Sequence, residues 1–241
     1  MENKLVEKTV ESVLEVVKTQ EKEISTNFKK LLPVLLEKGI DTIDLSMFDE
    51  PTKNELLTLL GDAYVKKGRL EDAVKTFVLA KRNDKLVEIG KDYEKVGLFN
   101  LAIDCFKLAE AKEELERIGD KCLKEGRLDS AIRAFRTLGN NEKLAQVGEA
   151  CVDKEKWDFA LEVFSSLNNK EKLAFLGDKA LAAKALTVAF RSYELSENKE
   201  KLKEFGDYCL KEGFVAMALK AYQLAGSDSM VKFIKSNFQI D

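Results

Sequence analysis

The sequence predicts an all-α protein built as a curved, right-handed solenoid of helix-turn-helix repeats. Three features predict this fold: a glycine, an alanine and an aromatic residue each recur six times with a period of 29 residues. A strict period of this length indicates an array whose units bury their apolar faces against one another. The glycines are Gly61, Gly90, Gly119, Gly148, Gly177 and Gly206. The alanines are Ala73, Ala102, Ala131, Ala160, Ala189 and Ala218, and the aromatics are Phe77, Phe106, Phe135, Phe164, Tyr193 and Tyr222.

Residues 1–53 precede the array and do not follow its period. Their apolar residues alternate steps of four and three, which is the heptad-like spacing of a helix that packs on another helix. Two interpretations stay open: helices folded onto the first repeat as a cap, or a seam through which residues 1–36 pair two copies of the chain. The seam consists of Val6, Val10, Val13, Val17, Ile24, Leu31 and Val34, with Gln20 and Asn27 completing it. Pro33 should end or kink this helix, residues 39–53 should form a loop, and Pro51 should open the first repeat helix.

Residues 54–227 hold the six repeats, each predicted to contain a first helix, helix A, and a second helix, helix B. In the third repeat the apolar residues before the turn keep the three-and-four spacing of one helical face, and so do those after it. Gly68, Gly97, Gly126 and Gly213 fall between the two helices, where a left-handed residue is expected. Glu155 and Lys184 stand there in repeats four and five, so either the turn differs locally or these residues are strained.

The junctions between repeats carry a second signal. Asn140, Asn169 and Asn198 recur with the same period, and each is followed two residues later by a glutamate. This pattern predicts an N-cap followed by an acid in the first turn of helix A. Within a repeat, the glycine is expected to face the alanine, while the aromatic fills the wedge to the next repeat.

Residues 228–241 begin a seventh repeat with Met230, Val231 and Ile234 but stop after its first helix. A lone, more polar helix over the last repeat is the usual end of a solenoid, so the sequence predicts a C-terminal cap. The single tryptophan, Trp157, stands in a column of apolar residues and is expected in the core.

One repeat resembles a known family. The order Leu57, Leu60, Gly61, Tyr64, Ala73, Phe77 and Ala80 is similar to the tetratricopeptide pattern, although leucine replaces the tryptophan and the closing proline is missing. The repeat is also shorter than the usual ~34 residues, and phrases such as LKEGRLDSAIRAF resemble the helical hairpins of coatomer and intraflagellar-transport subunits. The resemblance implies a TPR-like fold and a protein that holds other proteins.

Composition narrows the function. The net charge of −3 lacks the basic excess of a general nucleic-acid binder, and we expect no membrane span, no signal peptide and a cytoplasmic location. The chain has no histidine and no glycine-rich phosphate loop, so we expect no enzyme, no metal and no cofactor. The four cysteines do not form the spaced pairs of a metal or disulfide framework, and Cys122, Cys151 and Cys209 share one column that should hold buried thiols.

If the family arrangement holds, helix A lines a concave surface. An apolar column runs along it, with acidic residues beside it. In repeats one, three and six a lysine follows the acid four residues later, whereas in repeats four and five that lysine is missing. Such a stripe with unneutralised acids would suit a basic amphipathic peptide, but the same column could instead pack between neighbouring A helices. The candidate partner-binding residues are Leu123, Val152, Leu181, Leu210, Glu149, Asp153 and Asp178.

The sequence therefore favours a scaffold or adaptor that binds a protein or peptide. A structural module that pairs through residues 1–36 is a second hypothesis, and a nucleic-acid-binding regulator is a less favoured third. The lysines alternate with acids instead of forming a basic stripe, which argues against the third.

Overall fold

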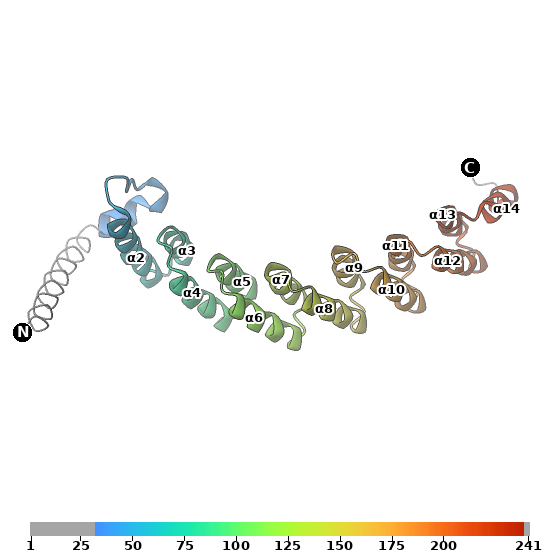
Figure 1. The fold of residues 1–241 in the computed structure, drawn as a ribbon, viewed down its shortest axis with the longest axis horizontal. Coiled ribbons are helices and arrows are strands. Elements are labelled where there is room, and N and C mark those ends of the chain that lie inside the picture. The colour runs from blue at the N-terminus through green and yellow to red at the C-terminus, as the bar shows by residue number, and fades with distance from the viewer. Residues whose placement is uncertain (1–31, 239–241) are drawn as a thin grey trace, which may run out of the picture. The chain divides into compact units, whose positions relative to one another are not determined.

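A computed structural model describes residues 32–238, and its secondary structure is entirely helical, with no strand in that range (Figure 1). Residues 32–38 are helical and lead into the 3-10 helix η1 (Ile40–Thr42). Thirteen α-helices follow. They are α2 (Glu50–Lys66), α3 (Leu70–Leu79), α4 (Asn83–Lys95), α5 (Phe99–Leu108), α6 (Lys112–Lys124), α7 (Leu128–Leu138), α8 (Asn141–Asp153), α9 (Trp157–Ser166), α10 (Lys170–Ala182), α11 (Leu186–Ser196), α12 (Lys199–Lys211), α13 (Val215–Ala225) and α14 (Asp228–Phe238).

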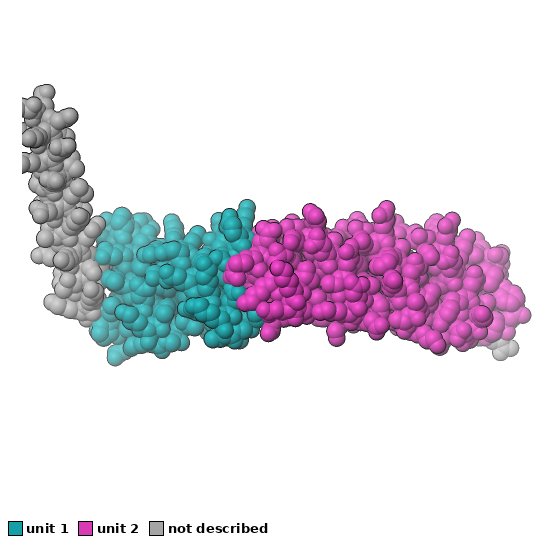
Figure 2. Space-filling model, turned by 90° about the horizontal axis from the view of Figure 1, so that it is seen from below, with its two compact units in different colours: residues 1–115 teal, residues 116–241 magenta. Residues whose placement is uncertain are grey.

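The chain divides into two compact units, residues 1–115 and residues 116–241, and the boundary falls inside α6 (Figure 2). Within the first unit, α2 packs on α3, α3 on α4 and α4 on α5. Within the second, every helix from α7 to α14 packs on the next one. Contact between consecutive helices is typical of a helical-repeat solenoid, so the predicted all-α repeat fold is confirmed.

The recurring glycine makes room for an aromatic ring of the same repeat. A Cβ atom added to Gly119 would lie 2.8 Å from two ring carbons of Phe135, and the same collision recurs in all six repeats. The atoms nearest to such a Cβ atom thus belong to the ring, and the predicted approach of the glycine to the alanine stays a prediction. In the fifth repeat the aromatic ring also reaches the next repeat, as predicted, since the Tyr193 ring centroid lies 6.0 Å from that of Phe205.

The turn inside each repeat keeps one geometry. Glu155 and Lys184 have φ angles of 54° and 61°, close to the 74° of Gly126. In each case the residue after the left-handed position donates to the carbonyl five residues back, for example Lys156 N–H to Cys151 O at 2.8 Å. Of the two alternatives, the structure therefore shows the unchanged turn with a non-glycine residue held in the left-handed region.

A second left-handed residue closes every helix B, which the sequence analysis missed. These residues are Lys81, Glu110, Gly139, Asn168, Glu197 and Gly226. The predicted N-caps follow in repeats four to six, where Asn140, Asn169 and Asn198 each accept a hydrogen bond from a backbone N–H three residues on. At these three junctions the chain therefore ends one helix and caps the next within three residues, whereas Arg82 makes no such cap before α4.

At the N-terminal side of the array, Asp49 caps α2 and Pro51 is the second residue of the helix, close to its predicted place. Most of the heptad-like seam lies outside the described residues, so the cap and dimer hypotheses for residues 1–36 stay predictions. The predicted loop contains η1, whose Ile40 is buried together with Leu36.

At the C-terminal end, α14 packs on α13 and buries Ile234. Lys235 stands 29 residues after Gly206, so α14 lacks the glycine that accommodates an aromatic ring in the six repeats. This agrees with α14 as the end of the array, and its role as a cap stays a prediction. Trp157 is half-buried against the core of the second unit, so it contributes to that core without lying wholly inside it.

Candidate functional site

A ladder of ion pairs joins consecutive A helices. In the first five repeats, the residue after the glycine pairs with a residue 23 positions later, at the start of the next helix A. The pairs are Asp62–Lys85 at 3.6 Å, Lys91–Glu114 at 2.8 Å, Asp120–Lys143 at 2.8 Å, Glu149–Lys172 at 2.5 Å and Asp178–Lys201 at 3.1 Å. The hydrogen bond from Lys143 to Asp120 raises the pKa of the lysine. The ladder shows which side of each helix A meets its neighbour.

Two of the predicted acids are part of this ladder. Glu149 pairs with Lys172, and Asp178 pairs with Lys201 and also accepts a hydrogen bond from the Tyr193 hydroxyl at 2.9 Å. The prediction that these acids are unneutralised is therefore wrong, because their lysines belong to the following repeat. Asp153, the third predicted acid, is exposed on the last turn of α8.

The ladder ends at the sixth repeat. Met230 occupies the place that lysine holds in most of the earlier repeats, and the acid of this repeat, Asp207, accepts a hydrogen bond from the Tyr222 hydroxyl at 2.5 Å. In repeats five and six the aromatic is therefore a tyrosine that binds the acid of its own repeat. Burial, together with these bonds to carboxylates, raises the pKa values of Tyr193 and Tyr222.

The predicted apolar column is largely covered. Val152 is only 5% exposed, while Leu123, Leu181 and Leu210 are half-buried. Leu181 and Leu210 pack against the core cluster of the second unit. Val152 is therefore largely inaccessible to a partner, and the three leucines are only partly accessible.

The outer surface of the A helices is formed by other positions. On α10, Phe175, Lys179 and Ala182 are spaced by four and three residues, so they share one helix face, and all three are exposed. Phe175 is 42% exposed, and the Lys179 ammonium lies 5.5 Å from its ring centroid. By the 29-residue period, Asp153 of α8 corresponds to Ala182, and Tyr208 of α12 corresponds to Lys179.

Phe175 is not among the site residues predicted from the sequence, although the sequence contains a signal for it. The residue two positions before the glycine is a leucine in the first repeat and polar or charged in every other repeat except the fifth. Phe175 is therefore the aromatic exception in a column that is otherwise largely polar, and it is 42% exposed. Phe175 is thus a candidate contact for a partner.

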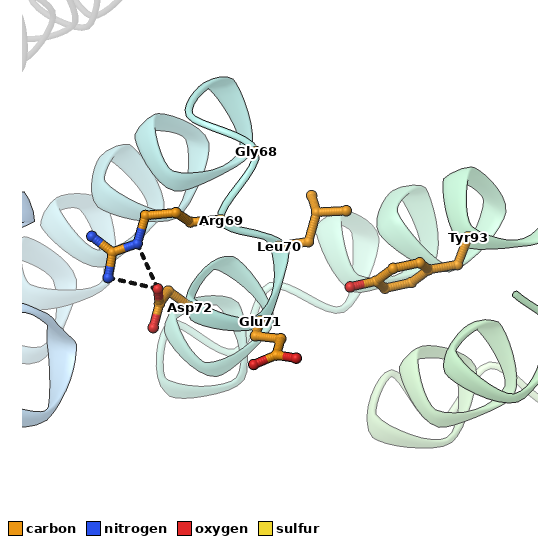
Figure 3. Close-up of a pocket in the computed structure, with 6 residues that line it drawn as sticks. All are labelled: Gly68, Arg69, Leu70, Glu71, Asp72 and Tyr93. Atoms are coloured by element: carbon orange, nitrogen blue, oxygen red, sulfur yellow. Dashed lines mark hydrogen bonds and ion pairs between the residues drawn. The ribbon is translucent and has the colours of Figure 1, made fainter. Parts of the chain in front are cut away.

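Two hollows lie on the first unit. One, of about 190 Å³, lies between α2 and α4, with Val65, Phe77 and Ile89 among its lining residues. The other, of about 420 Å³, lies where the first hairpin turn meets α4. Its lining residues are Gly68, Arg69, Leu70, Glu71, Asp72 and Tyr93 (Figure 3).

The larger hollow is built from groups that hold the fold. The Arg69 guanidinium binds Asp72 at 2.7 Å, donates to the Leu36 carbonyl at 3.2 Å and lies 4.7 Å above the Tyr64 ring. Burial raises the pKa of Tyr93, so its hydroxyl stays protonated at neutral pH. The hollow is a polar cleft at the surface, and the contacts of Arg69 link the backbone of Leu36 to the first hairpin.

The cysteines are buried thiols. Burial raises the pKa values of Cys105, Cys151 and Cys209 to about 11, which keeps them protonated and poorly nucleophilic at neutral pH. Across residues 32–238, no group of three or more cysteines and carboxylates has the geometry to bind a metal ion. Over the same range, none of the helices combines the length and apolarity that crossing a bilayer requires.

Comparison with known families agrees with this architecture. A family model described as tetratricopeptide repeat matches residues 56–89, which include Gly61, Ala73 and Phe77. Comparison with curated proteins finds no match to this chain. The match and the helix-pair fold together define a TPR-like α-helical repeat protein.

Proposed function

We propose that this protein is a non-enzymatic, cytoplasmic scaffold that binds a protein or peptide on the A-helix face of its second unit. TPR repeats generally take part in protein interaction, and the observation that carries the proposal is the exposed ring of Phe175. Aromatic side chains are among the residues that contribute most to binding when a partner covers them.

The partner-binding residues predicted from the sequence contribute less to this proposal, because most of them are partly covered or already paired. Leu123, Leu181 and Leu210 are half-buried, so a partner could still touch their exposed edges, whereas Val152 is buried. Asp153 is an exposed carboxylate on α8, whereas Glu149 and Asp178 already have lysine partners. Ala150 and Ala182, which are small, leave room for a partner's side chains between the longer ones.

The test compares proteins captured from the source cells by the full-length chain and by a Phe175→Ser variant, using quantitative mass spectrometry. Because Phe175 is exposed, the substitution should leave the fold intact, which circular dichroism checks. We expect at least one captured protein to be depleted by about tenfold or more, the effect of losing a central aromatic contact.

A Leu108→Ser variant is the matched control, since Leu108 is similarly exposed but lies on helix α5 of the first unit. The control should capture the same proteins as the wild type. Equal capture by the wild type and the Phe175→Ser variant would contradict the proposal.

A further inference from the structure

The B helices of the second unit carry a separate exposed surface. Two of them present an apolar, a basic and a second apolar residue at spacings of three and four, so each triplet lies on one helix face. The triplets are Val188, Arg191 and Leu195 on α11, and Met217, Lys220 and Leu224 on α13. Together these six residues are called the α11/α13 surface.

The two triplets lie over one core. Val188 and Met217 are half-buried and pack against the same cluster, which contains residues of both helices. Leu195 and Leu224 extend further and are 39% and 44% exposed. Leu195 and Leu224 occupy the same position in successive B helices, and covering their exposed surface would be favourable by roughly 25 cal/mol per Å² of apolar area.

The α11/α13 surface also carries two basic residues. Arg191 and Lys220 are exposed, and neither makes an ion pair with a residue in the range 32–238. By contrast, Arg136 on α7 pairs with Glu162 on α9 at 2.7 Å. Glu194, three residues after Arg191, is the exposed acid of α11, and α13 contains no acid. On the two helices together, the two exposed cations therefore outnumber the one exposed acid.

The corresponding positions elsewhere have a different chemistry. On α5 the same columns hold Leu101, Asp104 and Leu108, so an acid replaces the central cation. On α7 they hold Ser130, Arg133 and Thr137, which removes the apolar residues. Paired apolar residues with a central cation thus distinguish the last two repeats.

We propose that the α11/α13 surface binds an acidic amphipathic helix of a partner protein. Leucine-type side chains of that helix would cover Leu195 and Leu224, and its carboxylates would pair with Arg191 and Lys220. The seven-residue step between the two apolar positions on each helix matches two turns of an amphipathic helix. This partner would bind independently of the A-helix face, so one chain could hold two proteins.

The test uses two synthetic fluorescent peptides of about 18 residues, or roughly five helical turns. One has leucines on one helical face and glutamates on the other, and its counterpart has lysine in place of every glutamate. Fluorescence anisotropy measures their binding to the full-length chain. We expect the glutamate peptide to bind at least about tenfold more tightly than the lysine peptide, and added salt to reduce the difference.

Two variants locate the binding. The double substitution Arg191→Glu and Lys220→Glu should reverse the preference between the peptides, and Leu195→Glu with Leu224→Glu should abolish binding of the acidic one. The matched control, Leu101→Glu with Leu108→Glu, makes the same change in the same columns of α5 and should bind like the wild type. Circular dichroism confirms that each variant is folded.

Three results would overturn the proposal: no binding of the acidic peptide, equal binding of the two peptides, or unchanged affinity in the charge-reversed variant. None of these results bears on Phe175, which the capture experiment tests separately.

Discussion

Two columns of the repeat, both with a period of 29 residues, differ in what they tolerate. The glycine column has no exception in six repeats, because a Cβ atom at any of these positions would collide with a buried aromatic ring. The ion-pair column is reversed once, where Lys91 and Glu114 replace the usual acid and lysine. A steric contact admits one residue type, whereas an ion pair needs only opposite signs.

The turn column, which is the left-handed position between helix A and helix B of each repeat, is less strict than the glycine column and stricter than the ion-pair column. Four repeats have glycine at the left-handed position, while Glu155 and Lys184 adopt the same conformation in the other two. A side chain there raises the backbone energy without a collision, so the array accepts it at a modest cost. A column thus accepts other residue types only where replacing its usual residue costs little free energy.

The largest effect should come from adding a Cβ atom in the glycine column. Gly119→Ala should lower the free energy of unfolding by up to about 2 kcal/mol, since overpacking a core costs roughly 1–3 kcal/mol and the better helix propensity of alanine offsets about 1 kcal/mol. Urea denaturation followed by circular dichroism measures the change. Adding Phe135→Leu should recover part of the loss by making room for the methyl group. An unchanged midpoint for Gly119→Ala would show that the ring moves away without cost.

The turn column should give a smaller effect of opposite sign. Glu155→Gly and Lys184→Gly should each raise the free energy of unfolding by about 0.5–1 kcal/mol, because glycine adopts positive φ without strain. Gly97→Ala, at the same position in the second repeat, is the control and should lower it by a similar amount. A loss of stability in Glu155→Gly would mean that the glutamate side chain stabilises the turn.

The ion-pair column should give the smallest effect. Asp120→Lys and Lys143→Asp should each lower the free energy of unfolding, and the double substitution should restore it, with a coupling of about 0.5 kcal/mol. The natural reversal at Lys91 and Glu114 is the precedent. The double-mutant cycle should be run at low salt and repeated near 1 M, where screening should reduce the coupling. Additive single effects would show that the pair does not contribute to stability.

Local features of the fold were predictable because neighbours in sequence determine them. The helix pairs, the left-handed turn at Gly126 and the cap at Asn140 depend on residues within one or two helical turns. The second left-handed column could also have been found, since Gly139 and Gly226 occupy it in two repeats. The candidate site was harder to predict, because exposure depends on how neighbouring helices pack.

The sequence by itself determined the period, the helices, their turns and the apolar face of each helix, since these follow from residue spacing and backbone preference. Only the tertiary structure decided which side of helix A meets the next repeat. That choice buries Val152, gives Glu149 a lysine 23 residues away and leaves Phe175 exposed. The physical reason is that the angle and spacing between packed helices, which no single helix contains, determine which residues of a helix face meet a neighbour and which meet water.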